Sequence, residues 1–395
     1  MTSVTQVSLT VVEPLDVLVL YEWHSSSKVG KRWESNLLLS TAIDTCGLML
    51  TQAQQFLGQL GVPHPSRQAL FKTQRKIIIP VVNKLAALEL AAVVQETNAK
   101  PSAKVQIDEQ HSRPQKSAVT LGAAPFVTAT AINDEELIVA IAHEDATDNK
   151  GGAVKRVQRA LFGKLKNLSA PISDCVTDAC SSAHTTMQEV FAGSIHANCY
   201  QSYDLWHFLK DFLAEISALV STRTAKYART FRYMQLRALY DEGKISANKL
   251  KSWWINISKQ VAELTTLSDD QKVGAFEYMW RGAARHYGLT GEDKLAFEVW
   301  AESKISSIPF FIHGLTTSQT ESLHSLNNKY AIKGKIRSFQ LYSMRKNIAL
   351  LHWNELKRAR GADADALAEW DDAAAPIPLS FRRKIATAVI NQVTK

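Results

Sequence analysis

Residues 104–219 carry the clearest alternation of hydrophobic and polar positions in the chain. Runs that alternate at every second residue predict strands, and hydrophobic residues three or four apart predict helices. The expected strands are Lys104–Asp108, Ser117–Ile132, Glu136–His143, Pro171–Thr177 and Ser194–Tyr200. The expected helices are Ala153–Leu168, Ser181–Phe191 and Ser202–Leu219. This pattern predicts an α/β domain with a mixed sheet.

The segment before this domain reads as helical from Leu37 onward, after a short expected strand at Val17–Tyr21. Thr51 is placed to cap a helix over Gln52–Gln59, and Ser66 to cap a second helix, which Pro80 kinks or restarts. Two helices joined by a Leu-Gly turn match the outline of a helix-turn-helix, and two packed helices with a solvated basic face fit equally well. The second helix carries four basic residues and no acid, namely Arg67, Lys72, Arg75 and Lys76.

Residues 221–308 predict an all-helical segment with a basic first part. Arg223 to Lys259 holds nine Lys and Arg residues against two acids. A further helix begins near Thr317, and its spacing places Glu321 and His324 on one face. Beyond it, nine basic residues lie between Lys329 and Arg360. An Ala- and Asp-rich linker then precedes a short helix, Phe381–Val393.

Charge, hydropathy and cysteine content together limit which kinds of partner and compartment fit the protein. The chain has 395 residues and a net charge of +8, which favours a polyanionic partner. Its apolar runs are too short to predict a membrane span, and no secretory signal is expected at Met1. The four cysteines form no C-x-x-C pair; Cys180 with His184, or Cys199 with His207, could be zinc ligands, but buried thiols fit better. We therefore expect a protein that is neither secreted nor embedded in a membrane.

Three carboxylates end or follow predicted elements: Asp108, Asp178 and Glu321. They lie 70 and 143 positions apart, and the second gap fits a single domain only if the helical segment is an insertion. Three carboxylates that meet in one fold are the ligands that a pair of Mg²⁺ ions needs for phosphoryl transfer. The order of strands and helices is also that of an RNase H-like domain. The expected fold is thus an RNase H-like mixed sheet with helices, interrupted by an all-helical insertion and preceded by a helical N-terminal domain.

Two sequence blocks support a resemblance to a known family. The first is Thr177-Asp178 followed by Tyr203-Asp204-Leu205-Trp206-His207-Phe208-Leu209-Lys210; the second is Thr320-Glu321-Ser322-Leu323-His324-Ser325 with Tyr330, Lys333, Arg345 and Asn354. Over residues 40–360 the chain resembles cut-and-paste DNA transposases with a DDE catalytic domain, most closely the Kolobok and Mutator-like group. The segment around the first expected carboxylate departs from the family, which tends to have a Gly-Asp-Gly or similar context where this chain has Gln106-Ile107-Asp108-Glu109-Gln110. Asp108 is preferred there because it ends a β-run, whereas Glu109 points to the other face.

The resemblance implies two Mg²⁺ or Mn²⁺ ions, bridged by Asp108 and held by Asp178 and Glu321. It also implies catalytic roles for Asp204, His207 and His324, cleavage of transposon ends and strand transfer into target DNA. Double-stranded DNA would be the partner, with contacts from the four basic residues of the second helix and from Lys329, Lys333 and Arg345. A homodimer or higher oligomer is expected, in the nucleus of a eukaryotic host or otherwise in the cytoplasm or nucleoid.

The expected domains are a helical N-terminal domain (1–98), the first part of the catalytic core (104–220), the insertion (221–310), the last core helix with Glu321 (311–360) and a linker with a C-terminal tail (361–395). Three alternatives remain open. The protein could be a domesticated or inactive transposase that only binds DNA, an RNase H-like nuclease of another kind such as a resolvase, or a helical scaffold.

Overall fold

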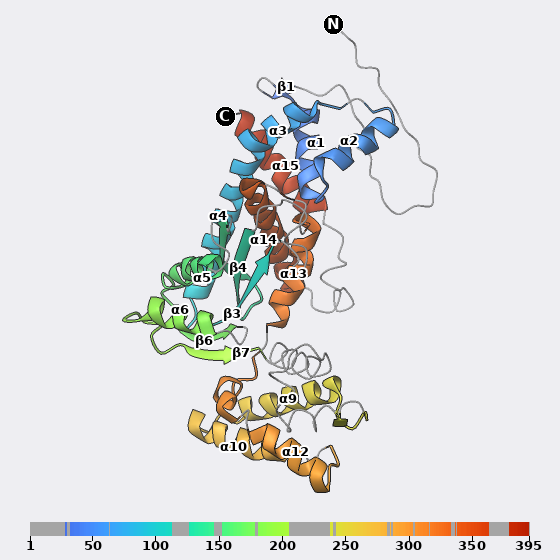
Figure 1. Cartoon of the computed structure of the whole chain (residues 1–395). Helices are drawn as coiled ribbons and strands as arrows, with labels where there is room; N and C mark the ends of the chain where they lie inside the picture. Colours follow the sequence, from blue (N-terminus) through green and yellow to red (C-terminus); the bar gives the residue numbers. More distant parts are fainter. Residues whose placement is uncertain are drawn as a thin grey trace. The chain divides into compact units, whose positions relative to one another are not determined.

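The computed structural model describes most of the chain (Figure 1). The described residues are 28–29, 32–62, 64–112, 126–145, 152–177, 181–204, 238–239, 242–282, 285, 287–302, 305–315, 317–332, 336, 338–362 and 379–394. They form two compact units. Unit 1 comprises Met1–Ala92, His111–Phe126 and Leu323–Lys395, and unit 2 comprises Val93–Gln110 and Val127–Ser322. The division of the chain into five domains and segments, which we expected from the sequence, stays a prediction.

Unit 2 is built on a five-stranded mixed sheet with the strand order β5-β4-β3-β6-β7. The strands are β3 (Ala103–His111), β4 (Phe126–Asn133), β5 (Ile138–Asp145), β6 (Ile172–Thr177) and β7 (Tyr200–Tyr203). β6 pairs in parallel with both β3 and β7. The expected order of three strands, helix, strand, helix and strand is confirmed, with α5 (Gly152–Leu165) after β5 and α6 (Ser181–Phe191) after β6.

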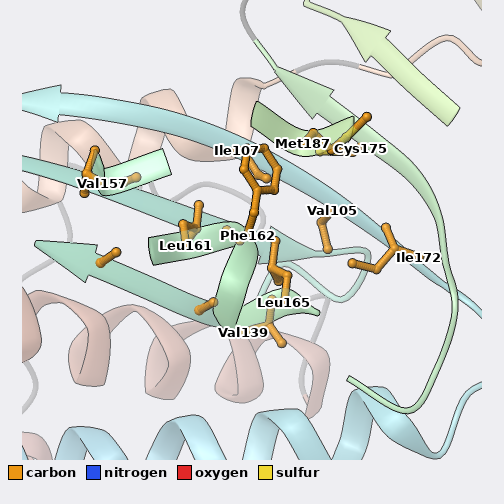
Figure 2. Packing of buried hydrophobic residues seen from close by; sticks show 14 of the residues in the cluster. Val105, Ile107, Val139, Val157, Leu161, Phe162, Leu165, Ile172, Cys175 and Met187 are labelled. Carbon is orange, nitrogen blue, oxygen red and sulfur yellow. The ribbon is translucent and has the colours of Figure 1, made fainter. Parts of the chain in front are cut away.

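One face of this sheet packs against α5 and α6 through a hydrophobic core (Figure 2). Val105 and Ile107 of β3 meet Val157, Leu161 and Phe162 of α5 there, and all five side chains are almost completely buried. Because side chains alternate along a strand, every second residue of β3 contributes to this core and the residues between them face the other way. The apolar positions of β3 and the 3.6-residue period of α5 therefore account for this layer.

The expected strand Ser194–Tyr200 is wrong, because the strand is Tyr200–Tyr203. Residues 192–199 form turns instead, with Ser194 N donating to Phe191 O and Cys199 N donating to His196 O. The fully buried His196 side chain occupies the position that an apolar strand residue was expected to fill, and its Nδ1 accepts from Ile172 N at 3.1 Å. Ile195, which looked like a strand residue, is 58 % exposed. The expected helix Ser202–Leu219 begins inside β7, and its remainder lies outside the described residues.

The later part of unit 2 is helical with a core of its own. It contains α9 (Ala247–Ala262), α10 (Asp269–Arg281), α12 (Gly291–Glu302) and the 3-10 helix η2 (Ile305–Phe310). Phe276, Trp280, Phe297 and Ile308 are buried together in this core. The indole of Trp280 donates to Ala301 O at 2.9 Å, so its polar edge is satisfied inside the core.

Unit 1 is almost entirely helical in its described part, apart from the short pair β1 (Lys28–Val29) and β2 (Arg32–Trp33). Its helices include α1 (Glu34–Thr45), α2 (Leu50–Gln59), α3 (Arg67–Thr73), the π-helix η1 (Gln74–Ile78), α4 (Ile79–Asn98), α14 (Phe339–Ala362) and α15 (Leu379–Thr394). The division assigns the first five residues of α13 (Ser318–Tyr330) to unit 2 and the rest of this helix to unit 1. The expected strand Val17–Tyr21 and most of the expected linker 361–378 lie outside the described residues.

The expected cap at Ser66 is confirmed, since its Oγ accepts from Ala69 N at 3.3 Å. The expected cap at Thr51 is wrong, because α2 begins at Leu50, two residues earlier than expected, and its N-cap is Met49. Pro80 does not break the helix. The π-helix η1 precedes it, with Ile79 N bonded to Gln74 O, and the wider turn accommodates a residue that has no N–H to donate.

The continuous helix Arg67–Asn98 is long and apolar enough to cross a membrane by length and composition alone, with a mean hydropathy of 2.0 over its most apolar window. The expectation was drawn from the short apolar runs of the sequence and did not anticipate this long helix. Core helices of globular proteins pass the same test. Within unit 1 this helix bonds to α14, because Asn347 Nδ2 donates to Asn83 Oδ1 at 2.9 Å and Asn354 Nδ2 donates to Glu89 Oε1 at 3.2 Å.

Candidate active site

Strand β3 presents Asp108 and Glu109 on opposite faces of the sheet. Glu109 lies on the α5 side, where its Oε1 accepts from Gln158 Nε2 at 2.8 Å. Asp108 lies on the other face, is only 5 % exposed, and its Oδ1 accepts from Glu109 N at 2.7 Å. The expected orientation of the two carboxylates is confirmed. A carboxylate on the face without α5 is therefore held on a central strand. The strand continues three residues past Asp108 to His111, so the expected strand end at Asp108 is wrong.

The register of the parallel strands shows which residues of β6 and β7 lie level with Asp108. Gln106 of β3 is opposite Val176 of β6, and Thr177 of β6 is opposite Tyr203 of β7. Asp108 stands two residues beyond Gln106, and Asp204 follows Tyr203 directly. Asp204 N donates to Thr177 O at 2.9 Å, which extends the ladder by one residue. The carboxyl ends of neighbouring parallel strands thus bring Asp108 and Asp204 to the same edge of the sheet.

Asp204 also holds the start of α13. Its Oδ1 accepts from Thr317 N at 3.1 Å, and the carboxylate is 1 % exposed. Thr317 O in turn accepts from Glu321 N at 3.1 Å, the first bond of the helix. Glu321 is an exposed residue in the first turn of α13. A second contact, from Gln319 Nε2 to Glu136 Oε1 at 2.7 Å, joins this turn to the residues between β4 and β5.

The sheet face that carries Asp108 is polar and buried. Val127, Ala129 and Ala131 of β4 lie in the core with α5, so Thr128 and Thr130 point to the Asp108 side, and both are 1 % exposed. Two hydroxyl oxygens are buried with no hydrogen-bond partner among the described residues: Ser202 Oγ, two positions before Asp204, and Oγ1 of Thr317, whose backbone N–H bonds to Asp204. Buried polar atoms of this kind are normally bonded to water or a ligand.

The donors on this face are hard oxygens, which suit Mg²⁺ or Mn²⁺ better than softer metals. Among the described residues, no three His, Cys, Asp or Glu side chains gather closely enough to hold a metal ion. Asp178, the second expected ligand, lies outside that set, directly after the end of β6. The oxygen donors of the described residues are of the type that suits a divalent cation, and the roles expected for Asp178 and for the metal ions stay predictions.

A second cluster on the same sheet was not found from the sequence. His313 bonds through Nδ1 to Asp174 of β6, lies 3.5 Å through Nε2 from Asp269 of α10, and stacks on Tyr200 with the ring centroids 4.1 Å apart. Burial alone would raise the pKa of Asp174, but the hydrogen bonds from His313 and Ser173 outweigh it, and the net effect is to lower that pKa. His313 therefore links the sheet to the first turn of α10. The only available signal was an acidic residue inside the apolar run Ile172–Thr177.

The other expected site residues are distributed over both units. His207 and Lys333 lie outside the described residues, as Asp178 does. His324 and Lys329 are partly exposed on α13. The four expected DNA contacts on α3 and η1 are all exposed, namely Arg67, Lys72, Arg75 and Lys76. The sequence favoured buried thiols over zinc ligation. Of the residues in the two possible zinc pairs, Cys180 and His207 are not described, His184 is half-buried, and Cys199 is a half-buried thiol outside any disulfide.

Arg345 was expected to contact DNA, and its placement contradicts that expectation. The side chain is 2 % exposed in unit 1. Its guanidinium donates to three backbone carbonyls, those of Gly47 at 3.1 Å, Leu48 at 2.5 Å and Tyr330 at 2.9 Å, and to Asp44 Oδ1 at 3.3 Å. Both terminal nitrogens are engaged in these bonds, and Nε is buried without a partner among the described residues. No donor of Arg345 is therefore exposed to a phosphate, and Arg345 is a structural residue.

Comparison with known proteins leaves the family open. No family model and no curated protein matches the chain. Among solved structures, the Drosophila P element transposase strand transfer complex matches over 93 % of this chain and 94 % of that chain, with 12 % identity and a TM-score of 0.30. A likeness this distant carries no argument about mechanism, and the comparisons give no support for the Kolobok and Mutator-like group. The functional conclusion rests on the geometry of the strand ends and of α13.

Proposed function

We propose that the protein is a metal-dependent DNA strand transferase of the DDE transposase type. Asp108, Asp178 and Glu321 would hold two Mg²⁺ or Mn²⁺ ions. One observation carries the proposal: Asp204 bonds both to Thr177, the residue before Asp178, and to Thr317, one helical turn before Glu321. The strand order β5-β4-β3-β6-β7 is also the order of an RNase H-like sheet, in which the first and fourth strands deliver carboxylates to one edge.

Each residue of the proposed site has a physical basis for its role. Asp108 is buried on the polar sheet face, where a carboxylate needs a counter-charge and where its attraction to a cation is weakly screened by water. Glu321 lies in the first turn of α13 and its side chain is exposed, so solvent and a bound ion can reach it. When bound, the metal ions would activate the attacking oxygen and stabilise charge on the leaving oxygen at phosphorus.

The proposed substrate is double-stranded DNA, both transposon ends and target. The exposed residues Arg67, Lys72, Arg75 and Lys76 lie within ten positions on α3 and η1 and would bind backbone phosphates. Arg67 also stacks over Phe71, with 5.4 Å from its guanidinium carbon to the ring centroid. His207, His324, Lys329 and Lys333 are proposed to contribute near the DNA. Assembly as a dimer or higher oligomer and a nuclear or nucleoid location belong to the same proposal.

The test is metal-dependent nicking and strand transfer on supercoiled plasmid and on short duplexes, with Mg²⁺ or Mn²⁺. Asp108→Asn, Asp178→Asn and Glu321→Gln should each lower the rate by at least about 10²-fold, as expected when a group that stabilises transition-state charge is lost. Binding to DNA, measured by fluorescence anisotropy, should change little because phosphate contacts come from Lys and Arg.

The matched control is Glu109→Gln, which alters the neighbouring carboxylate on the opposite face. It should keep nearly full nicking activity, because Glu109 bonds to Gln158 and does not reach the Asp108 side. An Asp108→Asn protein that stays active, or a Glu109→Gln protein that loses activity while folded, would remove Asp108 from the site.

The second candidate is a transposase-derived protein that binds DNA without cutting it. The basic residues of α3 and η1 favour it, since they belong to unit 1 and none of the proposed metal ligands does. Tight, salt-dependent binding without nicking in either metal would favour this candidate over a strand transferase.

A further inference from the structure

Asp204 stands between two segments that are far apart in the sequence. Its backbone N–H donates to Thr177 O at 2.9 Å, at the end of β6, and its carboxylate accepts from Thr317 N at 3.1 Å. These two bonds join residues 140 positions apart, from 177 to 317. Thr177 immediately precedes Asp178, and Thr317 O bonds to the backbone N–H of Glu321. One residue therefore ties the segments that carry two of the proposed metal ligands.

We propose that Asp204 is a positioning residue that sets the place of Glu321 by capping α13, and that it is not itself a metal ligand. The inference rests on the proposed function for the role of Glu321. Thr317 has the position of an N-cap, since its carbonyl accepts the first helical bond, but its own hydroxyl makes no cap and has no partner among the described residues. Asp204 instead accepts from the backbone N–H of Thr317, which is the bond that the acidic side chain of a capping box makes to the N-cap residue.

The geometry explains why a carboxylate is used. Asp204 is 1 % exposed, and a buried carboxylate without a hydrogen-bonded partner is strongly disfavoured. The N–H groups at the start of a helix provide both a donor and a favourable dipole for that charge. The bond to Thr317 N then restrains the position of the start of α13, and Glu321 lies in the first turn of that helix.

The hydrogen bond to Thr317 N needs an acceptor oxygen but not the negative charge of Asp204. Two substitutions therefore separate a positioning role from a role as a metal ligand. Asp204→Asn keeps an acceptor oxygen in the same place, whereas Asp204→Ala removes it. If Asp204 is a positioning residue, the metal affinity of the Asn variant should stay close to that of the wild type, and the metal affinity of the Ala variant should fall. If Asp204 is a metal ligand, both variants should lose metal affinity. In the Asn variant a neutral amide oxygen replaces the anionic ligand, and in the Ala variant no ligand replaces it.

The first measurement is hydrogen–deuterium exchange of peptides that cover residues 314–325, and it needs no catalytic activity. Asp204→Ala should speed exchange of the Thr317 and Glu321 amides by about ten-fold or more, the effect of losing a hydrogen bond to a charged acceptor, and Asp204→Asn should leave it nearly unchanged. Peptides of α5 should be unaffected in both variants. Unchanged exchange in a folded Asp204→Ala protein would overturn the inference.

The second measurement is the Mg²⁺ or Mn²⁺ concentration at half-maximal binding, by calorimetry, and at half-maximal nicking. Asp204→Ala should raise it by about 10- to 100-fold, and Asp204→Asn by far less, as for residues that orient metal ligands. In a Glu321→Gln background, Asp204→Ala should add almost nothing, because the two act on one ligand. Equal losses in the Asn and Ala variants, or additive losses with Glu321→Gln, would overturn the inference.

The two proposals fail in different ways. If the wild-type protein binds no divalent cation and cuts no DNA, the proposed function is wrong. The hydrogen–deuterium exchange measurement still tests in that case whether Asp204 stabilises the start of α13. If Asp204→Ala does not fold, Asp204→Ser serves in its place, since a serine hydroxyl is too short to reach Thr317 N.

Discussion

Replacement of Arg345 by Met is predicted to destabilise the protein and not to weaken a DNA contact. The change removes the partner of Asp44, whose carboxylate is 1 % exposed and otherwise bonded only to Gln74 Nε2 at 2.8 and 3.0 Å among the contacts described above. It also leaves three backbone carbonyls without their donor. Breaking a buried ion pair on one side costs about 3–5 kcal/mol. Because a domain is stable by only about 5–15 kcal/mol, the loss is a large share of the total.

The size of this loss should depend on pH. Burial raises the pKa of Asp44 even in the presence of the opposing Arg345 guanidinium and the Gln74 amide. Without Arg345 that pKa rises further, so the folded state binds a proton more readily than the unfolded state. Stability then increases as pH falls through the folded pKa, because the carboxyl becomes neutral and needs no counter-charge. The destabilisation should therefore shrink as the pH is lowered from neutral.

Urea unfolding followed by circular dichroism at several pH values measures this. The control is Arg75→Met, the same substitution at an exposed position of unit 1, which should change the unfolding free energy by less than about 0.5 kcal/mol. Adding Asp44→Asn to Arg345→Met should recover part of the loss, since the uncompensated charge is gone. An Arg345→Met protein of wild-type stability with weakened DNA binding would refute the structural role.

Three further predictions can be tested on the same protein. Burial, followed by the positive charges of Lys329 and Arg382, lowers the pKa of His352 to about 4 in the folded protein. Because the unfolded state binds the proton at a higher pH, the free energy of unfolding that is present above pH 6.5 decreases as pH falls, by about 2 kcal/mol near pH 5. His352→Asn should abolish that part of the pH dependence in urea unfolding; an unchanged slope would contradict it. The double variant Lys72→Ala with Lys76→Ala should weaken DNA binding and reduce its salt slope by roughly two, measured by anisotropy at several salt concentrations; an unchanged slope would exclude these residues as phosphate contacts. Phe162→Ala should cost about 3–5 kcal/mol of unfolding free energy, because the ring is fully buried between α5 and α6; a loss below about 1 kcal/mol would contradict the packing.

Local patterns predicted the elements around the candidate site well. The alternation of β3 placed Asp108 and Glu109 on opposite faces, and the contact of Glu109 with Gln158 confirms it. The helix Ser181–Phe191 was predicted with the same bounds that α6 has. These successes share a cause, since strand alternation and helix period are set by residues close in sequence that pack on one core.

What could not be predicted depends on contacts between distant residues. Arg345 looks like any basic surface residue until Asp44, some 300 positions earlier, is found beside it. Asp174 and His313 are 139 positions apart, and no local pattern joins them. The position of β7 was missed because the buried polar side chain of His196, held by Ile172, does not follow the apolar rule. The role of Asp204 likewise emerges only when Thr317 is placed at its carboxylate.

The most direct test of the account is the anomalous diffraction of Mn²⁺ in a crystal of the protein grown or soaked with that ion. The account predicts Mn²⁺ bound by the carboxylates of Asp108, Asp178 and Glu321, with Asp204 bonded to Thr317 and outside the coordination shell. Mn²⁺ bound elsewhere, or these three carboxylates on opposite sides of the sheet, would contradict it.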